Sequence, residues 1–266
     1  MHTEVLPSEQ IRYFSNLSKT QVLGCDISQG QFNDMLNVVI QYAEGNISSY
    51  VCFANVHMLY EANNDPEFKT VVNTSNIVCP DGRPISLLMQ SLNRLKQDRV
   101  CGMDFMPALL SVAERKGLKV FFYGSTDNIL EAISKEVSIK LPNLQIVGSY
   151  SPPFRKLTAK EDQNVVEMIN NSGAQIVFVS LGCPKQEIWM NEHIGKINSC
   201  MLGVGQAFKT FAGIEKRLPK PFRNLGVEWI YRLSIEPKRL WKRYFRSNSW
   251  FLLECLKLLM PKQNFN

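Results

Sequence analysis

The sequence predicts a Rossmann-like, doubly wound α/β fold with a mostly parallel sheet and a basic, aromatic, helical C-terminal appendage. Three observations lead to this prediction. Short β-branched runs alternate with stretches of helical period along most of the chain. Several of these runs are apolar throughout, which is typical of parallel strands that are covered on both faces. Residues 216–266 instead combine basic and aromatic side chains.

The expected elements follow from these runs in chain order. β-Branched and aromatic residues favour strands, and each strand is followed by a stretch with helical spacing. The strands are expected at 21–27, 50–56, 76–80, 119–124, 145–150, 175–182 and 200–205. The helices are expected near 30–44, 57–73, 84–96, 104–116, 127–140, 159–172 and 185–197. We therefore predict a Rossmann-like catalytic domain in residues 1–215 and the appendage in 216–266.

The formal charge of +6 is unevenly distributed along the chain. Residues 216–262 hold twelve Lys and Arg against three Asp and Glu, whereas the remainder is slightly acidic. A near-neutral body with a basic tail indicates an anionic partner: a membrane surface, a nucleic acid or an acidic protein.

The seven cysteines form no CxxC pair, and we expect buried free thiols in a reducing compartment. The N-terminal stretch MHTEVLPSEQIRYF has no apolar signal core. No uncharged apolar run reaches the roughly 18 residues that a spanning helix needs. These observations predict a cytoplasmic protein, soluble or peripheral on a membrane.

Polar, glycine-bearing turns follow the expected strands. Ligands bind at the carboxyl ends of strands in a doubly wound sheet, where glycine allows close approach and helix N-termini favour phosphate. The turns therefore predict a site for a phosphorylated small molecule, although ordinary βα turns are the alternative. The candidate binding residues are Asn55, His57, Gly82, Gly124, Ser125, Tyr150, Gly182, Pro184, Lys185, Gly205 and Gln206.

Three residues are candidates for catalysis. Asp81 in CPDGRP follows an apolar strand and is suited to act as a general base, or alternatively to cap the next helix. Arg99 is suited to clamp a phosphate, or is an ordinary surface arginine. Gln186 lies at the start of a helix and is suited to hydrogen-bond a sugar or a phosphate. The alternative is a polar residue at a helix start that binds no ligand. His57, one of the candidate binding residues above, is suited to act as a base, or alternatively is a structural histidine.

Several motifs are absent from the sequence. GVGQAF supplies only the first half of GxGxxG, and neither a P-loop nor GxSxG occurs. Without Asp-x-Asp or clustered Cys and His, a metal-dependent transferase or a zinc site is disfavoured. We expect neither a cofactor nor a metal.

Four blocks resemble the WecG/TagA/CpsF family of bacterial glycosyltransferases over about residues 20–245. They are NVHMLYEANNDPEFKTVVNTSNIVCPDGRPI, RVCGMDFM, VSLGCPKQEIWM and RLPKPFRNLGVEWIYRLSIEPKRLWKRY. The resemblance implies an inverting, metal-independent transfer from a UDP-linked sugar, usually of the N-acetylmannosamine type. The implied acceptor is a sugar on undecaprenyl pyrophosphate, used for a cell-surface polysaccharide or teichoic acid.

The resemblance also implies roles for individual residues. It places the proposed base on Asp81, a phosphate-contacting arginine on Arg99, the family's glutamine on Gln186 and its strand-end asparagine on Asn55. The sequence departs from the family at Phe53, where Thr is frequent, and at Lys209, where many members have Asp. Two alternatives remain open: a nucleotide-dependent oxidoreductase on the same fold, and a nucleic-acid-binding protein that uses the basic tail.

The tail has an expected role of its own. Basic and aromatic residues in 226–246 are suited to an anionic lipid surface, and SWFLLECLKLLM is suited to the interface plane. The resemblance further implies that the tail closes over the active site. The alternatives are a helix pair packed on the core, and an apolar face used in a homo-oligomer. The arginines expected to contact the diphosphate or the membrane are Arg217, Arg223, Arg232, Arg239 and Arg243.

Overall fold

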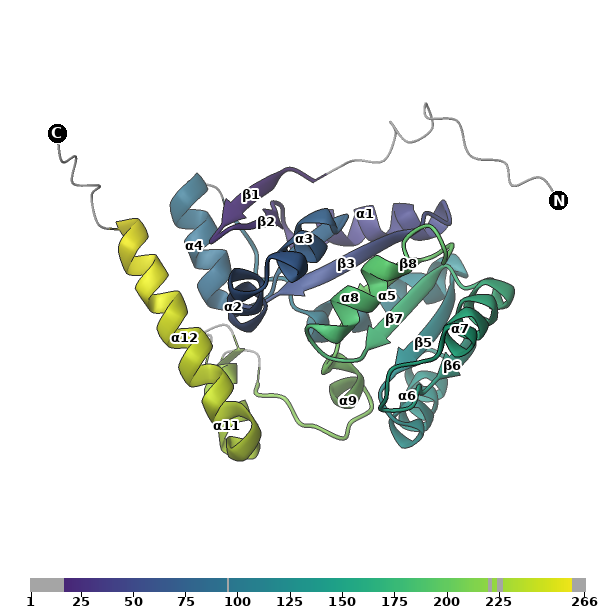
Figure 1. The fold of residues 1–266 in the computed structure, drawn as a ribbon. Helices are drawn as coiled ribbons and strands as arrows, with labels where there is room; N and C mark the ends of the chain where they lie inside the picture. Colours follow the sequence, from purple (N-terminus) through teal and green to yellow (C-terminus); the bar gives the residue numbers. More distant parts are fainter. Residues whose placement is uncertain (1–16, 95, 220–221, 224–226, 260–266) are drawn as a thin grey trace, which may run out of the picture.

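A six-stranded parallel sheet forms the centre of the molecule (Figure 1). The structure is a computed structural model that describes residues 17–94, 96–219, 222–223 and 227–259. The strand order is β4 (Ile77–Pro80), β3 (Ser49–Ala54), β8 (Cys200–Gly203), β7 (Ile176–Ser180), β5 (Lys119–Gly124) and β6 (Gln145–Tyr150). All five pairings are parallel. The predicted doubly wound α/β class is therefore confirmed.

The strand predicted at 21–27 is wrong. The chain instead forms an antiparallel hairpin of β1 (Lys19–Val22) and β2 (Cys25–Ser28), separate from the main sheet. Leu23 and Gly24 make its two-residue turn with φ of 49° and 86°. Two consecutive positive φ angles match the twist of a tight hairpin, and glycine allows the second at little cost.

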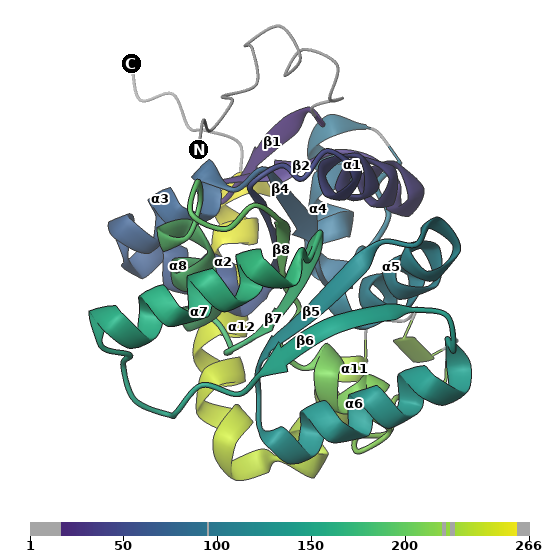
Figure 2. The same cartoon turned by 90° about the vertical axis from the view of Figure 1, so that its right-hand side faces the viewer.

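Helices cover both faces of the sheet, as Figure 2 shows. The core on one face includes residues of α1 (Phe32–Glu44), α5 (Gly102–Lys116), α6 (Asp127–Lys140) and α9 (Ala207–Phe211). The core on the other face includes residues of α2 (Val56–Asn64), α3 (Pro66–Thr74), α4 (Arg83–Asn93), α7 (Ala159–Ser172) and α8 (Lys185–Glu192). The strands of β3, β7 and β8 are buried almost throughout, which explains their continuous apolar runs.

Two helix predictions need correction. The single helix expected at 57–73 is divided between α2 and α3, because Asp65 caps α3 by accepting from the backbone N–H groups of Glu67 and Phe68. Pro66 then takes the first helical position, where its missing N–H costs nothing. The helix expected to run to residue 197 ends at Glu192, and Gly195 follows in a turn with φ of 75°.

The C-terminal segment forms α11 (Glu228–Ile235) and the long α12 (Pro237–Leu259). α12 lies along α2 (Figure 1), and its Leu240 and Phe251 are buried. Trp250 packs edge-on against Tyr60 of α2 with ring centroids 5.8 Å apart. The tail therefore packs on the body through one side of α12, while its other side remains exposed.

Two further expectations concern cysteines and membranes. All seven cysteines are free, and five of them are buried. Within the described ranges, no helix is both long enough and apolar enough to cross a bilayer. The N-terminal stretch that lacks a signal core, residue 95 of the expected helix 84–96, and residues 260–266 lie outside the described residues.

Candidate active site

The predicted site residues lie along one edge of the sheet. Because the six strands run parallel, their carboxyl ends share that edge. Asn55 and His57 follow β3, and Asp81 and Gly82 follow β4. Gly124 ends β5 and Ser125 follows it, and Tyr150 ends β6. The residues after β7 are Gly182, Pro184, Lys185 and Gln186, and those after β8 are Gly205 and Gln206. What each of them binds stays a prediction.

The backbone around Asp81 is held from two sides. The N–H of Asp81 donates to the carbonyl oxygen of Ala54 at 2.7 Å, and the N–H of Val100 donates to Pro80 at 2.9 Å. The second bond brings the segment that carries Arg99 next to Asp81. Gly82 is the N-cap of α4, and no side chain caps this helix. The helix-cap alternative for Asp81 is therefore wrong.

The environment of Asp81 raises its pKa to about 7. Burial is the main cause, and the negative charge of Glu228 adds to it. The cationic side chains of Arg99, Arg232 and Arg217 act in the opposite direction. A carboxyl group whose pKa lies near neutral pH can accept a proton and later release it, as a general base must.

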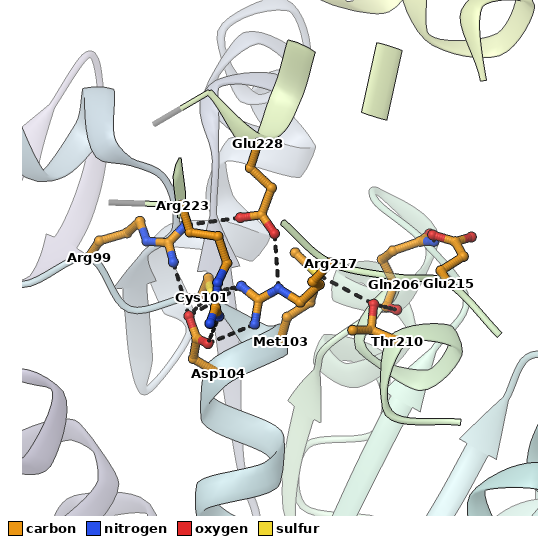
Figure 3. Close-up of polar contacts among 10 residues, drawn as sticks. All are labelled: Arg99, Cys101, Met103, Asp104, Gln206, Thr210, Glu215, Arg217, Arg223 and Glu228. Atoms are coloured by element: carbon orange, nitrogen blue, oxygen red, sulfur yellow. Dashed lines mark hydrogen bonds and ion pairs between the residues drawn. The ribbon is translucent and has the colours of Figure 1, made fainter. Parts of the chain in front are cut away.

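Arg99 belongs to a group that we call the arginine–carboxylate cluster, formed by Arg99, Asp104, Arg217, Arg223 and Glu228 (Figure 3). Arg99 donates from Nη2 to Asp104 Oδ2 at 3.0 Å and from Nη1 to Glu228 Oε2 at 3.1 Å. Its side chain is only 15% exposed, so the surface-arginine alternative is wrong.

Arginines of the C-terminal segment complete the cluster. Arg217 donates from Nη1 to Asp104 Oδ1 at 2.7 Å and from Nε to Glu228 Oε1 at 2.9 Å. Arg223 Nη1 lies 2.8 Å from the same Asp104 oxygen. The tail thus reaches the edge of the sheet, where Arg99 lies, and the cluster carries a formal charge of +1.

Sequence reasoning missed the two carboxylates of the cluster, although both stand in the blocks of family resemblance. Burial alone would raise the pKa of Asp104, but hydrogen bonds from Arg217 and Cys101 hold it at about 2. The Cys101 thiol lies 2.9 Å from Asp104 Oδ2. Asp104 therefore stays ionised and fixes the three arginines. A carboxylate at the first turn of α5, beside an arginine, was the available signal.

The remaining tail arginines lie elsewhere. Arg232 lines a narrow pocket beside the cluster and lowers the pKa of Asp81. Arg239 forms an exposed ion pair with Glu236. The pKa of His57 is lowered to about 4, mainly by burial and then by the positive charge of Arg243. His57 is therefore neutral at pH 7. Its Nδ1 lies 3.4 Å from Glu61 Oε1, but a neutral imidazole forms no ion pair with this carboxylate.

Gln186 connects two strand ends. Its Oε1 accepts from the N–H of Gly182 at 3.1 Å, and its Nε2 donates to the carbonyl oxygen of Gly203 at 2.8 Å and to Glu187 at 2.7 Å. The side chain is 5% exposed. These bonds use both N–H groups of the amide, so Gln186 shapes the loop after β7. A direct contact with substrate stays a prediction.

Backbone geometry tightens the same edge around β5 and β8. A Cβ on Gly124, where φ is 105°, would lie 2.5 Å from the carbonyl oxygen of Ser180, so the position requires glycine. Ser125 donates its N–H to that oxygen at 2.9 Å, and the Ser180 hydroxyl donates to Gly205 at 2.9 Å. Gln206 hydrogen-bonds Glu215, which directly precedes the tail (Figure 3).

A narrow pocket of about 20 Å³ separates the body from the tail beside the cluster. The body contributes Gln206 and Thr210, and the tail contributes Arg217, Glu228 and Arg232. Its volume is enough for about one water molecule and far too small for a nucleotide. In the part of the chain that the structure describes, no group of three or more His, Cys, Asp or Glu side chains is arranged to hold a metal.

Comparison with known proteins adds to this geometry. The model of the glycosyl transferase WecG/TagA/CpsF family matches residues 20–264. An N-acetylglucosaminyldiphosphoundecaprenol N-acetyl-beta-D-mannosaminyltransferase from Bacillus subtilis (strain 168) is 31% identical over 84% of this chain and 85% of the relative. A relative of the same name from Staphylococcus aureus (strain NCTC 8325 / PS 47) is 30% identical over 85% of this chain and 88% of the relative. Another from Bacillus spizizenii is 30% identical over 76% of this chain and 77% of the relative.

Proposed function

Because the chain belongs to the WecG/TagA/CpsF family of glycosyltransferases, we propose that it transfers an N-acetylmannosamine-type sugar from UDP to N-acetylglucosamine on undecaprenyl diphosphate. The sugar and the acceptor are those named for its relatives. Membership of a glycosyltransferase family favours this activity over the oxidoreductase and nucleic-acid-binding alternatives. Assembly of a cell-surface polymer is the proposed role.

The observation that carries the proposal is the pairing of a poised carboxyl group with a cationic cluster. Asp81 has a pKa of about 7, and the positive charges of Arg99, Arg232 and Arg217 act on it to lower that pKa. Sugar transfer needs a base for the acceptor hydroxyl and positive charge for the leaving diphosphate. The edge of the sheet near β4 supplies both.

In the proposed reaction, Asp81 takes the proton from the acceptor hydroxyl. The hydroxyl oxygen forms a bond to the anomeric carbon of the donor, on the face opposite UDP, and the bond from that carbon to the diphosphate oxygen breaks. The configuration at the anomeric carbon inverts. The electron pair of the broken bond goes to UDP, and the proton stays on Asp81 until solvent accepts it.

The leaving diphosphate needs cationic stabilisation. Arg99, Arg217 and Arg223 converge from the body and the tail, and arginine forks match phosphate oxygens bidentately. Arg232 lies beside them. We propose that these arginines stabilise the departing UDP without a metal ion. The division into residues 1–215 and a site-completing appendage belongs to the same proposal.

A membrane role for the tail follows from the proposed acceptor, whose lipid anchor lies in a bilayer. The exposed side of the tail helices carries large apolar side chains: Trp229, Ile230, Trp241, Phe245, Leu252, Leu253 and Leu256. Arg239, Lys242 and Arg246 are exposed on α12. Aromatic and basic residues together favour an anionic lipid interface. We propose peripheral binding at the inner face of the plasma membrane; self-association through the same face stays an alternative.

The activity is tested by UDP release from a panel of UDP-sugars with a synthetic lipid-diphosphate-GlcNAc acceptor. Turnover with an N-acetylmannosamine donor, and a product of disaccharide mass, is expected. Addition of a chelator should leave the rate unchanged. Binding of UDP without turnover on any donor would remove the proposed acceptor, and absence of UDP binding would remove the nucleotide-sugar donor.

The membrane role is tested by cosedimentation with vesicles that contain anionic lipid. Phe245→Ser on α12 should weaken binding, because this side chain is 71% exposed on the proposed interface. Phe154→Ser is the matched control, since Phe154 is 92% exposed but lies outside the tail. Equal binding by both variants and the unaltered protein would contradict the membrane role.

A further inference from the structure

Glu228 bridges two arginines of different origin. Its Oε2 accepts from Arg99 Nη1 at 3.1 Å and its Oε1 accepts from Arg217 Nε at 2.9 Å. The carboxylate is 13% exposed, and each arginine side chain is 15% exposed. Two anionic oxygens held between two guanidinium groups reproduce the way in which arginines bind a phosphate.

Arg217 has little free capacity for a further anion. Arg217 also donates to both carboxylate oxygens of Asp104 and to the sulfur of Cys101, so four of its five N–H groups have partners. Arg99 donates to both carboxylates through two of its five N–H groups. A diphosphate placed against these two arginines would meet the negative charge of Glu228 in a largely buried setting, where screening by salt is weak.

The two carboxylates differ in how firmly they are held. Asp104 lies on α5, which packs in the core, and it accepts from all three arginines of the cluster. Glu228 lies in the first turn of α11, and none of the eight residues of this fully described helix is buried. The narrow pocket beside Glu228 is bounded by α11, and movement of this helix away from the body would enlarge it.

We propose that Glu228 holds the place of one donor phosphate in the free protein, keeping Arg99 and Arg217 oriented, and that the donor's diphosphate displaces it. Asp104 remains in place as the anchor of the arginines. Glu228 is thus a positioning residue whose negative charge competes with the ligand. The inference rests on the proposed function, because it takes a nucleoside diphosphate as the ligand.

The test is calorimetric titration of the full-length protein with UDP. Glu228→Gln keeps the shape of the side chain and removes its charge, so UDP should bind about tenfold more tightly. Because the cluster is largely buried, most of this gain should persist at high salt. Uridine, which has no phosphate, should show no gain. Asp104→Asn should weaken UDP binding, because it releases the anchored arginines.

Glu236→Gln is the matched control, since Glu236 also pairs with a tail arginine, Arg239, but outside the cluster. This variant should leave UDP affinity within about twofold of the unaltered protein. A similar gain in UDP affinity in Glu236→Gln would mean that the net charge of the protein, and not the position of Glu228, causes the effect. That result would overturn the proposal. Circular dichroism and thermal unfolding should show that each variant is folded, and Glu228→Ala provides a second charge-removing variant.

The outcomes separate the inference from the function on which it rests. If the unaltered protein binds UDP and Glu228→Gln binds it equally or more weakly, Glu228 supports the site and the proposed displacement is wrong. If neither Glu228 variant folds, Glu228 is a structural partner and the displacement is again wrong. If the unaltered protein does not bind UDP at all, the nucleotide-sugar donor and this inference fail together.

Discussion

Replacing Asp81 with Asn should stabilise the folded protein while it removes the proposed base. In the folded protein the pKa of Asp81 is raised from 3.8 to about 7, mainly by burial. The folded state therefore holds a proton between these pH values that the unfolded state has released. The unaltered protein loses stability as pH rises through this window, and the whole loss is present above pH 7.

The magnitude follows from the size of the pKa shift. About three pKa units at 1.36 kcal/mol each correspond to about 4 kcal/mol at pH 8. Asp81 keeps partial contact with solvent, so we expect a gain of about 2 to 4 kcal/mol for Asp81→Asn. For a chain of this size the gain raises the unfolding temperature by roughly 5 to 15 °C. At pH 5 the gain should fall to less than about half.

Thermal unfolding of both proteins at pH 5 and pH 8 measures this difference. Asp127→Asn, at an exposed position in the first turn of α6, is the control and should change stability by less than about 1 kcal/mol at either pH. An Asp81→Asn protein that is equally or less stable than the unaltered protein at pH 8 would refute the reasoning. The carboxylate of Asp81 would then not be destabilised by its surroundings.

Three further predictions concern the same edge of the sheet. Arg99→Lys should reduce kcat/KM by about 10- to 100-fold in steady-state assays, because an ammonium group cannot replace a fork that contacts both carboxylates; an unchanged value would place Arg99 outside the reaction. The kcat/KM of the unaltered enzyme should rise with pH through about 7, because Asp81 loses its proton there. In Glu228→Gln the same rise should occur at lower pH, because the negative charge of Glu228 raises the pKa of Asp81. Gly82→Ala should cost about 1–3 kcal/mol of stability in thermal unfolding, because φ is 117° there; Gly195→Ala, at φ of 75°, should cost less, and equal losses would contradict the argument.

The sheet could be predicted from sequence because its strands are buried on both faces. The sequences of β3 and β7 are continuous apolar runs. Such runs, when helical stretches separate them, predict a parallel sheet that is covered on both faces. The hairpin at the N-terminal side was missed because Leu23 has φ of 49°, a conformation that leucine seldom adopts. The break between α2 and α3 was foreseeable, since Asp65 and Pro66 are strong start signals for a helix.

The candidate site was only partly predictable. Asp81 and Arg99 stand in short motifs next to strand ends, and the structure holds their segments together by a single backbone hydrogen bond. Asp104 and Glu228 were missed because their roles depend on partners far away in sequence: Arg217 lies 113 residues from Asp104, and Arg99 lies 129 residues from Glu228. Local patterns cannot reveal a cluster that forms only when the tail folds back onto the body.

Gln186 shows another limit of sequence reasoning. A glutamine at a helix start after a glycine-bearing turn is suited to a ligand contact. In the structure its amide instead bonds Gly182, Gly203 and Glu187, which fixes the ends of β7 and β8 relative to each other. Whether a side chain faces a ligand or the backbone depends on where the neighbouring strand ends, and that information is not local.

The central claim is that Asp81 is the base of a sugar transfer assisted by the arginine–carboxylate cluster. The most direct measurement compares the unaltered enzyme with Asp81→Asn for two quantities: kcat with the lipid-linked acceptor, and Kd for UDP. The account predicts that kcat falls by about 10²- to 10⁴-fold while the Kd for UDP changes by less than about threefold. A folded Asp81→Asn enzyme that keeps full kcat would contradict the account.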